Sequence, residues 1–289
     1  MNINLFFCRP CDCDAGGSSL LQCHNTTGLC TCKANAEGDK CERCKNGTYN
    51  SDPDNPDGCS PCFCFNRANE CSSARGFVKS YIRTNFTDNQ HVNINKSPEL
   101  TFSHEDQRLT INFLSGTSVT LVFNKAFSGF QLHSYGQLFK LITNNTSVES
   151  LKSDWNVTLK GKYNRQPQEA AFNLHSESSS SGITYYARLH ERNSQQNLTA
   201  YQLQSILADI ESVQVQGSFM TNGSLTVVIE LVSATKDVGQ EVDYVENCTC
   251  SNNYTDLSCG FCNTGKIFKL CCITYCRKEK RNLNSCIGS

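Results

Sequence analysis

In this sequence, cysteine is the residue type whose number and spacing indicate specific chemistry. The chain has 20 cysteines among its 289 residues, and many of them stand in C-x-C and C-x-x-C pairs. Such pairs can form disulfide crosslinks, bind structural zinc or carry out thiol–disulfide exchange. The choice among these three depends on the surrounding residues and on the elements that must position the sulfur atoms.

The cysteines follow an internal repeat. The hexapeptide C-R-P-C-D-C at residues 8–13 returns as C-S-P-C-F-C at residues 59–64, and every cysteine keeps its place. A cysteine-based period near 50 residues is typical of a small disulfide-stapled module in an array. The second copy is interrupted, because Cys71 is followed by 176 residues without cysteine before the pattern resumes at Cys248. We therefore expect a large domain inserted into a small one.

Composition indicates an oxidising compartment. All 20 cysteines lie in the 113 residues (289 − 176) outside the gap, and this density favours a disulfide scaffold. The gap itself is long enough for a domain with its own core. The net charge of −1 gives no pull toward nucleic acid, and no run of 18 apolar residues predicts membrane insertion. Met1 to Phe7 is too short for a signal peptide, so we expect a fragment or an incomplete gene model.

Acceptor motifs for N-glycosylation support secretion independently. Eleven N-x-S/T motifs begin at Asn25, Asn46, Asn85, Asn95, Asn144, Asn145, Asn156, Asn197, Asn222, Asn247 and Asn253.

Zinc binding and redox catalysis are less favoured interpretations of the same cysteines. Paired C-x-x-C motifs do bind zinc, but here C-x-C pairs interleave with them and no partner histidine pair follows. A thioredoxin-like site needs a βαβ setting, which the sequence does not suggest. We expect no metal and no cofactor.

A hydrolytic site is also disfavoured. His190 lies in Y-A-R-L-H-E-R, and Ser134 and Asp209 would complete a triad on paper, but the six histidines are scattered and no G-x-S-x-G elbow is present. The basic run 277–281 could bind heparan sulfate, but it is more simply interpreted as a solvated tail. The acidic stretch 52–58 lacks a calcium-loop register and reads as a turn. We therefore expect no catalytic residues.

The elements that position the cysteines differ between module and insert. The module has little apolar periodicity and many glycine and proline turns, so crosslinks must hold it together. Its eight cysteines, from Cys11 to Cys59, allow 105 pairings, and spacing does not choose among them.

Inside the insert, period-two alternation predicts antiparallel strands. The alternating apolar residues are Leu109 to Phe113, Val119 to Phe123, Ile183 to Leu189 and Leu225 to Leu231. Short strands separated by turns favour a β-sandwich. One stretch, Leu203 to Ile210, has helical spacing, and Thr199 is placed to cap it, so we expect one short helix there.

Several segments resemble a known family. The segments C-D-C, G-L-C-T-C-K, G-D-K-C-E-R-C-K-N-G-T-Y and N-P-D-G-C-S-P-C resemble a laminin-type EGF-like repeat. C-F-C-F-N-R-A-N-E-C-S-S-A-R-G-F is similar to the start of a laminin IV type A domain, and V-E-N-C-T-C-S-N-N-Y-T-D-L-S-C-G-F-C to its end. F-N-K-A-F-S-G-F-Q-L-H-S-Y-G-Q-L-F-K-L within the insert is also similar to that domain. In laminin alpha and gamma chains and in perlecan, this domain interrupts an EGF-like repeat.

The resemblance implies a disulfide pairing. The implied bonds are Cys11–Cys23, Cys13–Cys30, Cys32–Cys41, Cys44–Cys59, Cys62–Cys71, Cys64–Cys248, Cys250–Cys259 and Cys262–Cys271, with Cys272 as the other candidate partner of Cys262. It also implies a mainly β fold, in which disulfide-stapled EGF-like modules flank an inserted, jelly-roll-like antiparallel sandwich.

The expected domain boundaries follow the cysteines. They are a remnant of a preceding repeat at residues 1–10, an EGF-like repeat at 11–61, the first half of a split repeat at 62–75, a laminin IV type A domain at 76–247, the second half of the split repeat at 248–272 and a divergent tail at 273–289.

The resemblance implies a secreted structural glycoprotein of the basement membrane, in which this segment is rod-like with a globular spacer. It would support matrix assembly and cell adhesion. Expected partners are other matrix proteins or laminin chains, with a glycosaminoglycan or a cell-surface receptor as further candidates. The alternative is a perlecan-like proteoglycan core or a glycan- or protein-binding module.

Overall fold

The computed structural model divides the chain into two compact units. It describes residues 10–84, 92–96, 101–105, 108–143, 153–164, 166–180 and 182–262, with the backbone alone at 92–96, 101–105, 108, 153 and 262. Gly76–Val242 forms one unit, and the chain before Gly76 together with the chain after Val242 forms the other. A contiguous unit is thus enclosed, in sequence, by a discontinuous one.

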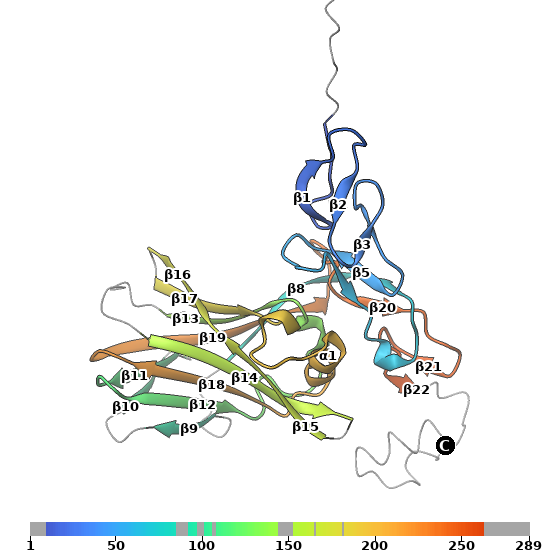
Figure 1. Ribbon diagram of the computed structural model, residues 1–289. Coiled ribbons are helices and arrows are strands. Elements are labelled where there is room, and N and C mark those ends of the chain that lie inside the picture. Colours follow the sequence, from blue (N-terminus) through green and yellow to red (C-terminus); the bar gives the residue numbers. More distant parts are fainter. Residues whose placement is uncertain are drawn as a thin grey trace, which may run out of the picture. The chain divides into compact units, whose positions relative to one another are not determined.

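Short two-stranded ladders build the first module of the discontinuous unit (Figure 1). Its strands are β1 (Ser18–Cys23), β2 (Cys30–Cys32), β3 (Ala36–Glu37), β4 (Arg43–Cys44), β5 (Thr48–Ser51) and β6 (Cys59–Pro61), paired in that order as β1–β2, β3–β4 and β5–β6. Strands this short bury little apolar area, so sequence-distant covalent bonds must supply the stability.

The second module is built from both sides of the insert. The 3₁₀ turn η1 (Cys64–Asn66) and β7 (Cys71–Ser73) precede the insert, and β20 (Glu246–Cys248), β21 (Tyr254–Thr255) and β22 (Phe261–Cys262) follow it. β7 pairs with β20 in an antiparallel ladder, so the two parts of the chain meet directly.

The insert is an antiparallel sandwich of two sheets, which Figure 1 shows as stacked layers. The seven-stranded sheet has the order β10 (Thr101–Glu105), β11 (Arg108–Phe113), β19 (Gly223–Lys236), β13 (Leu138–Thr143), β17 (Gly182–Arg188) and β16 (His175–Ser179), with β8 (Phe77–Arg83) also paired to β19. The five-stranded sheet has the order β15 (Gln166–Asn173), β14 (Ser153–Tyr163), β18 (Ser212–Phe219), β12 (Ser118–Phe123) and β9 (Val92–Lys96). The mainly β class and the sandwich predicted from sequence are confirmed.

The alternating apolar residues form one core between the sheets. Those of β11, β12, β17 and β19 are buried, while their neighbours along each strand face outward. Phe123, Phe127, Phe139 and Phe172 are fully buried in the same cluster. A core of this size makes the insert stable without crosslinks, consistent with its lack of cysteine.

A close contact fixes the middle of the five-stranded sheet. Trp155 of β14 lies opposite Gly217 of β18, and a Cβ atom at position 217 would lie 2.6 Å from the indole ring. Glycine is required here because the ring occupies the space of a side chain. Trp155 also packs edge-on against Phe219, with ring centroids 5.8 Å apart.

The one α-helix of the described residues, α1 (Ala200–Ala208), lies at one end of the sandwich (Figure 1). Thr199 caps it in a capping box with Gln202, as its position before the helical pattern predicts. Gly161 of β14 lets the helix approach, because a Cβ atom there would lie 3.1 Å from the carbonyl oxygen of Ile206. The helix ends earlier than the apolar spacing suggests, and Ile210 instead bridges to Gly129.

The two ends of the insert lie side by side. Phe77 pairs with Lys236 between β8 and β19, and the amide of Val242 donates to the carbonyl of Phe77 at 2.8 Å. An inserted domain with adjacent ends leaves its host module free to close, as the insertion hypothesis predicts.

Candidate functional site: the disulfide framework of the two modules

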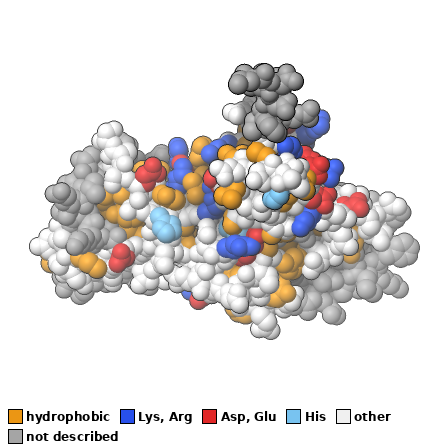
Figure 2. Space-filling model, turned by 45° about the horizontal axis from the view of Figure 1, so that its top comes forward, with side chains coloured by type: hydrophobic (Ala, Val, Ile, Leu, Met, Phe, Trp, Pro, Cys, Tyr) orange, Lys and Arg blue, Asp and Glu red, His pale blue; other side chains and the backbone are white. Residues whose placement is uncertain are grey.

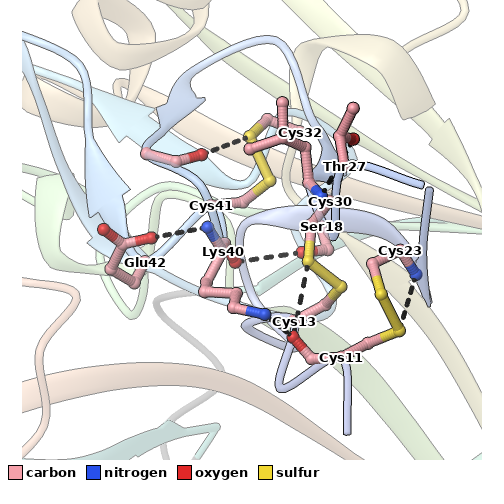
Figure 3. The surroundings of a disulfide bond; sticks show 12 residues. Cys11, Cys13, Ser18, Cys23, Thr27, Cys30, Cys32, Lys40, Cys41 and Glu42 are labelled. Carbon is pink, nitrogen blue, oxygen red and sulfur yellow. Dashed lines mark hydrogen bonds between the residues drawn. A yellow bond between two sulfur atoms is a disulfide. The ribbon is translucent and has the colours of Figure 1, made fainter. Parts of the chain in front are cut away.

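Four disulfides staple the first module. They are Cys11–Cys23, Cys13–Cys30, Cys32–Cys41 and Cys44–Cys59, with Cα–Cα distances of 5.4, 5.8, 5.2 and 5.7 Å. Figure 3 shows the first three close together. These distances are ordinary for disulfides, so the backbone accommodates the bonds.

Polar contacts complete the turns between these bonds. The ammonium group of Lys40 donates to the carbonyl of Cys11, and its amide donates to the Glu42 carboxylate at 3.0 Å (Figure 3). Backbone amides of Glu42 and Lys40 lower the pKa of the Glu42 carboxyl group. Lys33 donates to the carbonyls of Pro53 and Asn55, so the stretch 52–58 lies in a turn stabilised by a lysine.

Three disulfides staple the split module. They are Cys62–Cys71, Cys64–Cys248 and Cys250–Cys259, with Cα–Cα distances of 5.9, 5.8 and 5.5 Å. Cys64 and Cys248 are 184 residues apart, so this bond spans the whole insert. The structure thus brings together seven of the eight expected pairs. The expected partner of Cys262, Cys271, lies outside the described residues.

The insert occupies the place of a hairpin turn. In the first module Cys23 lies opposite Cys30 in the β1–β2 ladder, and in the second Cys71 lies opposite Cys248 in the β7–β20 ladder. The first module connects its two cysteines by residues 24–29, whereas the second connects them by residues 72–247. One surface turn has therefore been replaced by a domain.

The second half of the split module matches the first module at the corresponding disulfide. Cys32–Cys41 and Cys250–Cys259 both join cysteines nine residues apart. Cys41 and Cys259 are both left-handed, with φ of 60° and 58°. This agreement indicates that the two modules share the same backbone fold around this disulfide.

The split module has one feature that the first module lacks. Phe63 is right-handed helical and Cys64 is left-handed, a backbone sequence that points successive amides into one concavity. The carboxylate of Glu246 lies there, accepting from the amide of Phe63 at 2.8 Å and from that of Cys64 at 3.3 Å. The residue at the corresponding place in the first module is Gly28, two before Cys30.

Glu246 is almost completely buried, with 3% of the residue's surface exposed. Burial raises the pKa of this carboxyl group, and hydrogen bonds from Ser258, Phe63 and Cys64 act in the opposite direction. Glu246 therefore joins the chain after the insert to the chain before it through hydrogen bonds, beside the covalent bond of Cys64 and Cys248.

Arg67 makes a second noncovalent link between the halves. Its guanidinium donates to the carbonyls of Cys259 and Gly260, the latter at 2.9 Å. The same group lies 4.4 Å from the ring centroid of Tyr254, within cation–π range. Neither Glu246 nor Arg67 was identified from sequence, and the only signal was the position of Glu246 next to the point where the cysteine pattern resumes.

The structure does not assemble the triad considered from sequence. Among the described residues, the buried Ser134 hydroxyl has no hydrogen-bond partner, so none of them is placed as its base. His190 is buried, and its Nδ1 accepts from the amide of Arg192. Asp209 follows α1 as its C-cap. In the described part of the chain these three residues therefore have separate structural roles.

One group of possible metal ligands involves cysteine, namely Cys64, Glu246 and Cys248. Its two sulfur atoms are bonded to each other, so neither is a thiolate available to a metal.

The acceptor asparagines are mostly at the surface. Asn25, Asn46, Asn197, Asn222, Asn247 and Asn253 are exposed, and Asn156 is half-buried. Asn85, Asn144 and Asn145 lie outside the described residues, as does the side chain of Asn95.

The surface carries no large area of one charge in the view of Figure 2, where acidic and basic side chains are interspersed among uncharged ones. No helix of the described residues is long and apolar enough to cross a membrane.

Comparison with known proteins gives matches to both parts of this framework. Residues 11–59 match the family model of the laminin EGF domain, and residues 120–246 match that of Laminin B (Domain IV). Laminin subunit gamma-1 is similar over 89% of this chain, with 29% identity for the Danio rerio protein and 30% for the Homo sapiens protein. The basement membrane-specific heparan sulfate proteoglycan core protein of Mus musculus is 26% identical over 88% of this chain. The chain spans 20% of each of those gamma-1 subunits and 7% of the proteoglycan core.

Proposed function

We propose, from the premise that this chain carries a laminin EGF domain and a laminin B domain IV, that it is a structural segment of a basement-membrane protein. The observation that carries the proposal is that Cys71 lies opposite Cys248 in the β7–β20 ladder, as Cys23 lies opposite Cys30 in the β1–β2 ladder. The interrupted module therefore resumes in the same register. Laminin gamma chains and the basement-membrane proteoglycan core are its homologues over most of its length.

The proposed mechanism is mechanical and spatial. Crosslinked modules resist unfolding because their disulfides restrict the unfolded chain. Their short ladders hold a rod-like segment, and the sandwich is a globular spacer on it. Laminin EGF and laminin IV domains belong to structural matrix proteins, and we propose that this chain likewise catalyses no reaction and requires no cofactor.

Secretion and N-glycosylation belong to the same proposal. The seven disulfides among the described residues are expected to persist only in an oxidising compartment. Six exposed acceptor asparagines are accessible to glycans without disturbing the fold. The proposed partners are other matrix proteins or laminin chains, with a glycosaminoglycan or a cell-surface receptor as additional ligands.

Matrix incorporation tests this function. A tagged form of the full chain, fused to a secretion signal, would be expressed in cells that deposit a basement membrane. We expect it to be retained in the deposited layer after washing with physiological buffer. A matched variant, Cys64→Ser with Cys248→Ser, should be retained less well because its split module is open. Recovery of the wild-type chain entirely in the medium would contradict the proposal.

A second function is kept because of the homology to the proteoglycan core. In this alternative the chain belongs to a protein that carries sulfated polysaccharide chains. Metabolic labelling of the endogenous protein with radioactive sulfate distinguishes the two: label released by heparan sulfate lyase indicates the proteoglycan, and no released label indicates a laminin-type chain.

A further inference from the structure

The two outward faces of the sandwich differ in what they carry. On the five-stranded sheet one cross-strand row consists of Asn95, Thr120, Gln216, Asn156 and Asn173, each paired with its neighbours in the ladders. Asn156 faces outward, because its neighbours Trp155 and Val157 are buried. Asn156 is an acceptor asparagine, so this row places a glycan site on the outward face of the five-stranded sheet.

The strands of the seven-stranded sheet contain no acceptor asparagine. Their outward face carries cationic and aromatic side chains instead. On β8, Lys79, Tyr81 and Arg83 are all exposed, and the intervening residues turn toward the other side. Because side chains on one face of a strand repeat about every 6.6 Å, these three form a regular ladder of cation, ring and cation.

Contacts within this ladder hold its side chains together. The ammonium nitrogen of Lys79 lies 5.7 Å from the ring centroid of Tyr81, and the guanidinium carbon of Arg83 lies 5.5 Å from the same centroid. Arg83 donates to the buried carboxylate of Glu230 on β19 at 2.8 Å. These contacts place the two cations on either side of the Tyr81 ring.

Further cations lie across the same face. Lys140 of β13 lies opposite Glu230 of β19 in the strand pairing, and its ammonium nitrogen is 3.7 Å from the Glu230 carboxylate. Tyr186 and Arg188 of β17 follow on the next strand. Among the side chains of this face that the structure describes, the acidic ones are Glu230, which is paired with Arg83 and Lys140, and Glu177 on β16. Glu105 ends the strand β10 of the same sheet, and its side chain lies outside the described residues. Lys79, Arg83, Lys140 and Arg188 therefore outnumber the two acids.

We propose that this face, centred on Lys79, Tyr81 and Arg83, binds a sulfated glycosaminoglycan. The cations match sulfate groups, which remain ionised at neutral pH, and an exposed tyrosine ring offers a flat apolar surface to a sugar ring. The alternation along β8 fits a linear polymer whose charged groups recur at intervals. No acceptor asparagine lies within the strands of this face, and the exposed Asn222 directly precedes β19. The proposal rests on the proposed place of the chain in an extracellular matrix.

Heparin serves as the probe. The purified, secreted full chain would be titrated with heparin at 50 and 200 mM NaCl, and binding should weaken with salt because the contacts are exposed. The variant Lys79→Gln with Arg83→Gln should bind about tenfold more weakly, as expected for the loss of two charge-assisted contacts. Tyr81→Ala, with its charges intact, should lose about threefold through stacking.

A matched control exists on the other sheet. Lys160 and Lys162 of β14 also lie two residues apart on one outward face, and Lys162 is paired with Glu211 as Arg83 is with Glu230. Lys160→Gln with Lys162→Gln should leave heparin binding unchanged. Fluorescence of Trp155, the single tryptophan, reports whether each variant is folded.

Three outcomes would overturn the proposal: no binding by the wild-type chain, equal losses in the two double variants, or equally tight binding of unsulfated hyaluronan. Matrix incorporation is measured separately. A wild-type chain that enters the matrix but does not bind heparin overturns this surface alone, whereas a chain that binds heparin but stays in the medium overturns the proposed function alone.

Discussion

Glu246 lies two residues before Cys248, and its carboxylate accepts a hydrogen bond from the backbone amide of Phe63 at 2.8 Å. The two residues are 183 positions apart in sequence. This contact joins the two halves of the split module in addition to the disulfide. In it, a side chain that follows the insert binds the backbone that precedes the insert. Cys64 and Phe65 are left-handed, and each costs about 1–2 kcal/mol in that conformation, whereas Asn66, also left-handed, is of a residue type that adopts it more readily. The carboxylate stabilises the amides at the start of this turn.

Replacing Glu246 with alanine should destabilise the split module. The amides of Phe63 and Cys64 would lose a buried acceptor, at a cost of about 1–3 kcal/mol. Hydrogen–deuterium exchange of the peptide covering residues 60–70 measures this directly. Glu70→Ala, at an exposed carboxylate of the same module, is the control and should leave exchange unchanged. Equal exchange in the Glu246→Ala variant and the wild type would show that the contact is dispensable.

The raised pKa of Glu246 predicts a pH dependence. The folded module binds the proton more tightly than the unfolded chain, so the stabilisation by this group is fully present below about pH 4.5, its ordinary carboxyl pKa. It is lost as pH rises through the folded-state pKa, by about 1.4 kcal/mol for each pKa unit of difference. Glu246→Gln removes the ionisation, so the variant should gain stability relative to the wild type between pH 4.5 and 7. A constant difference across that range in matched exchange experiments would refute the burial argument.

Breaking Cys64–Cys248 should open the module and spare the sandwich. On the chain-entropy model, the loop of 184 residues makes this bond worth about 5 kcal/mol, an upper figure. Cys64→Ser with Cys248→Ser should therefore increase protease cleavage in residues 60–75 and 243–262. Trp155 fluorescence should keep its thermal midpoint, because the core lies within Gly76–Val242. Simultaneous loss of both signals would show that the two units are not independent.

Gly217→Ala tests the packing of the sandwich. The new Cβ atom would lie 2.6 Å from the Trp155 ring, and the ring must shift within a filled core. We expect a loss of about 1–3 kcal/mol, measured by Trp155 fluorescence during urea unfolding. Gly116→Ala is not a suitable control, because Gly116 is left-handed. Ser218→Ala, on the outward face of the same strand, is suitable and should change stability by less than about 0.5 kcal/mol.

The strands and the helix could be predicted from the residues themselves, whereas the disulfide pairing was implied only by the family resemblance. Alternation such as Leu109, Ile111 and Phe113 reports a half-buried strand directly, because the period of two is a property of the backbone. Thr199 marked the start of α1, but Ile210 extended the helical pattern past the true end at Ala208. Tertiary packing decided that end, since the Ile210 backbone bonds to Gly129 instead.

The link between Glu246 and Phe63 could not be predicted from sequence. It depends on a right-handed residue at Phe63 followed by a left-handed one at Cys64, and a cysteine does not favour the left-handed conformation. The contacts of Arg67 likewise require the chain to return beside it after the insert. Such contacts become visible only when the two halves are placed together.

The insert should fold by itself. Residues 76–246 contain the whole apolar core and no cysteine, and their two ends are already joined by hydrogen bonds between Phe77 and Val242. Expressed alone, this segment should give a β-type far-UV circular dichroism spectrum and a cooperative melt. A helical spectrum, or a melt without a transition, would count against an independent sandwich.

The central claim is that a domain interrupts a disulfide module which then resumes in register, and peptide mapping of the non-reduced, secreted protein tests it most directly. Digestion followed by mass spectrometry should recover one crosslinked species that joins the peptide containing Cys64 to the peptide containing Cys248. It should disappear on reduction and be absent from the Cys64→Ser, Cys248→Ser variant. Cys64 bonded to Cys62 or Cys71 instead would contradict the account, because the module would then close without the chain that follows the insert.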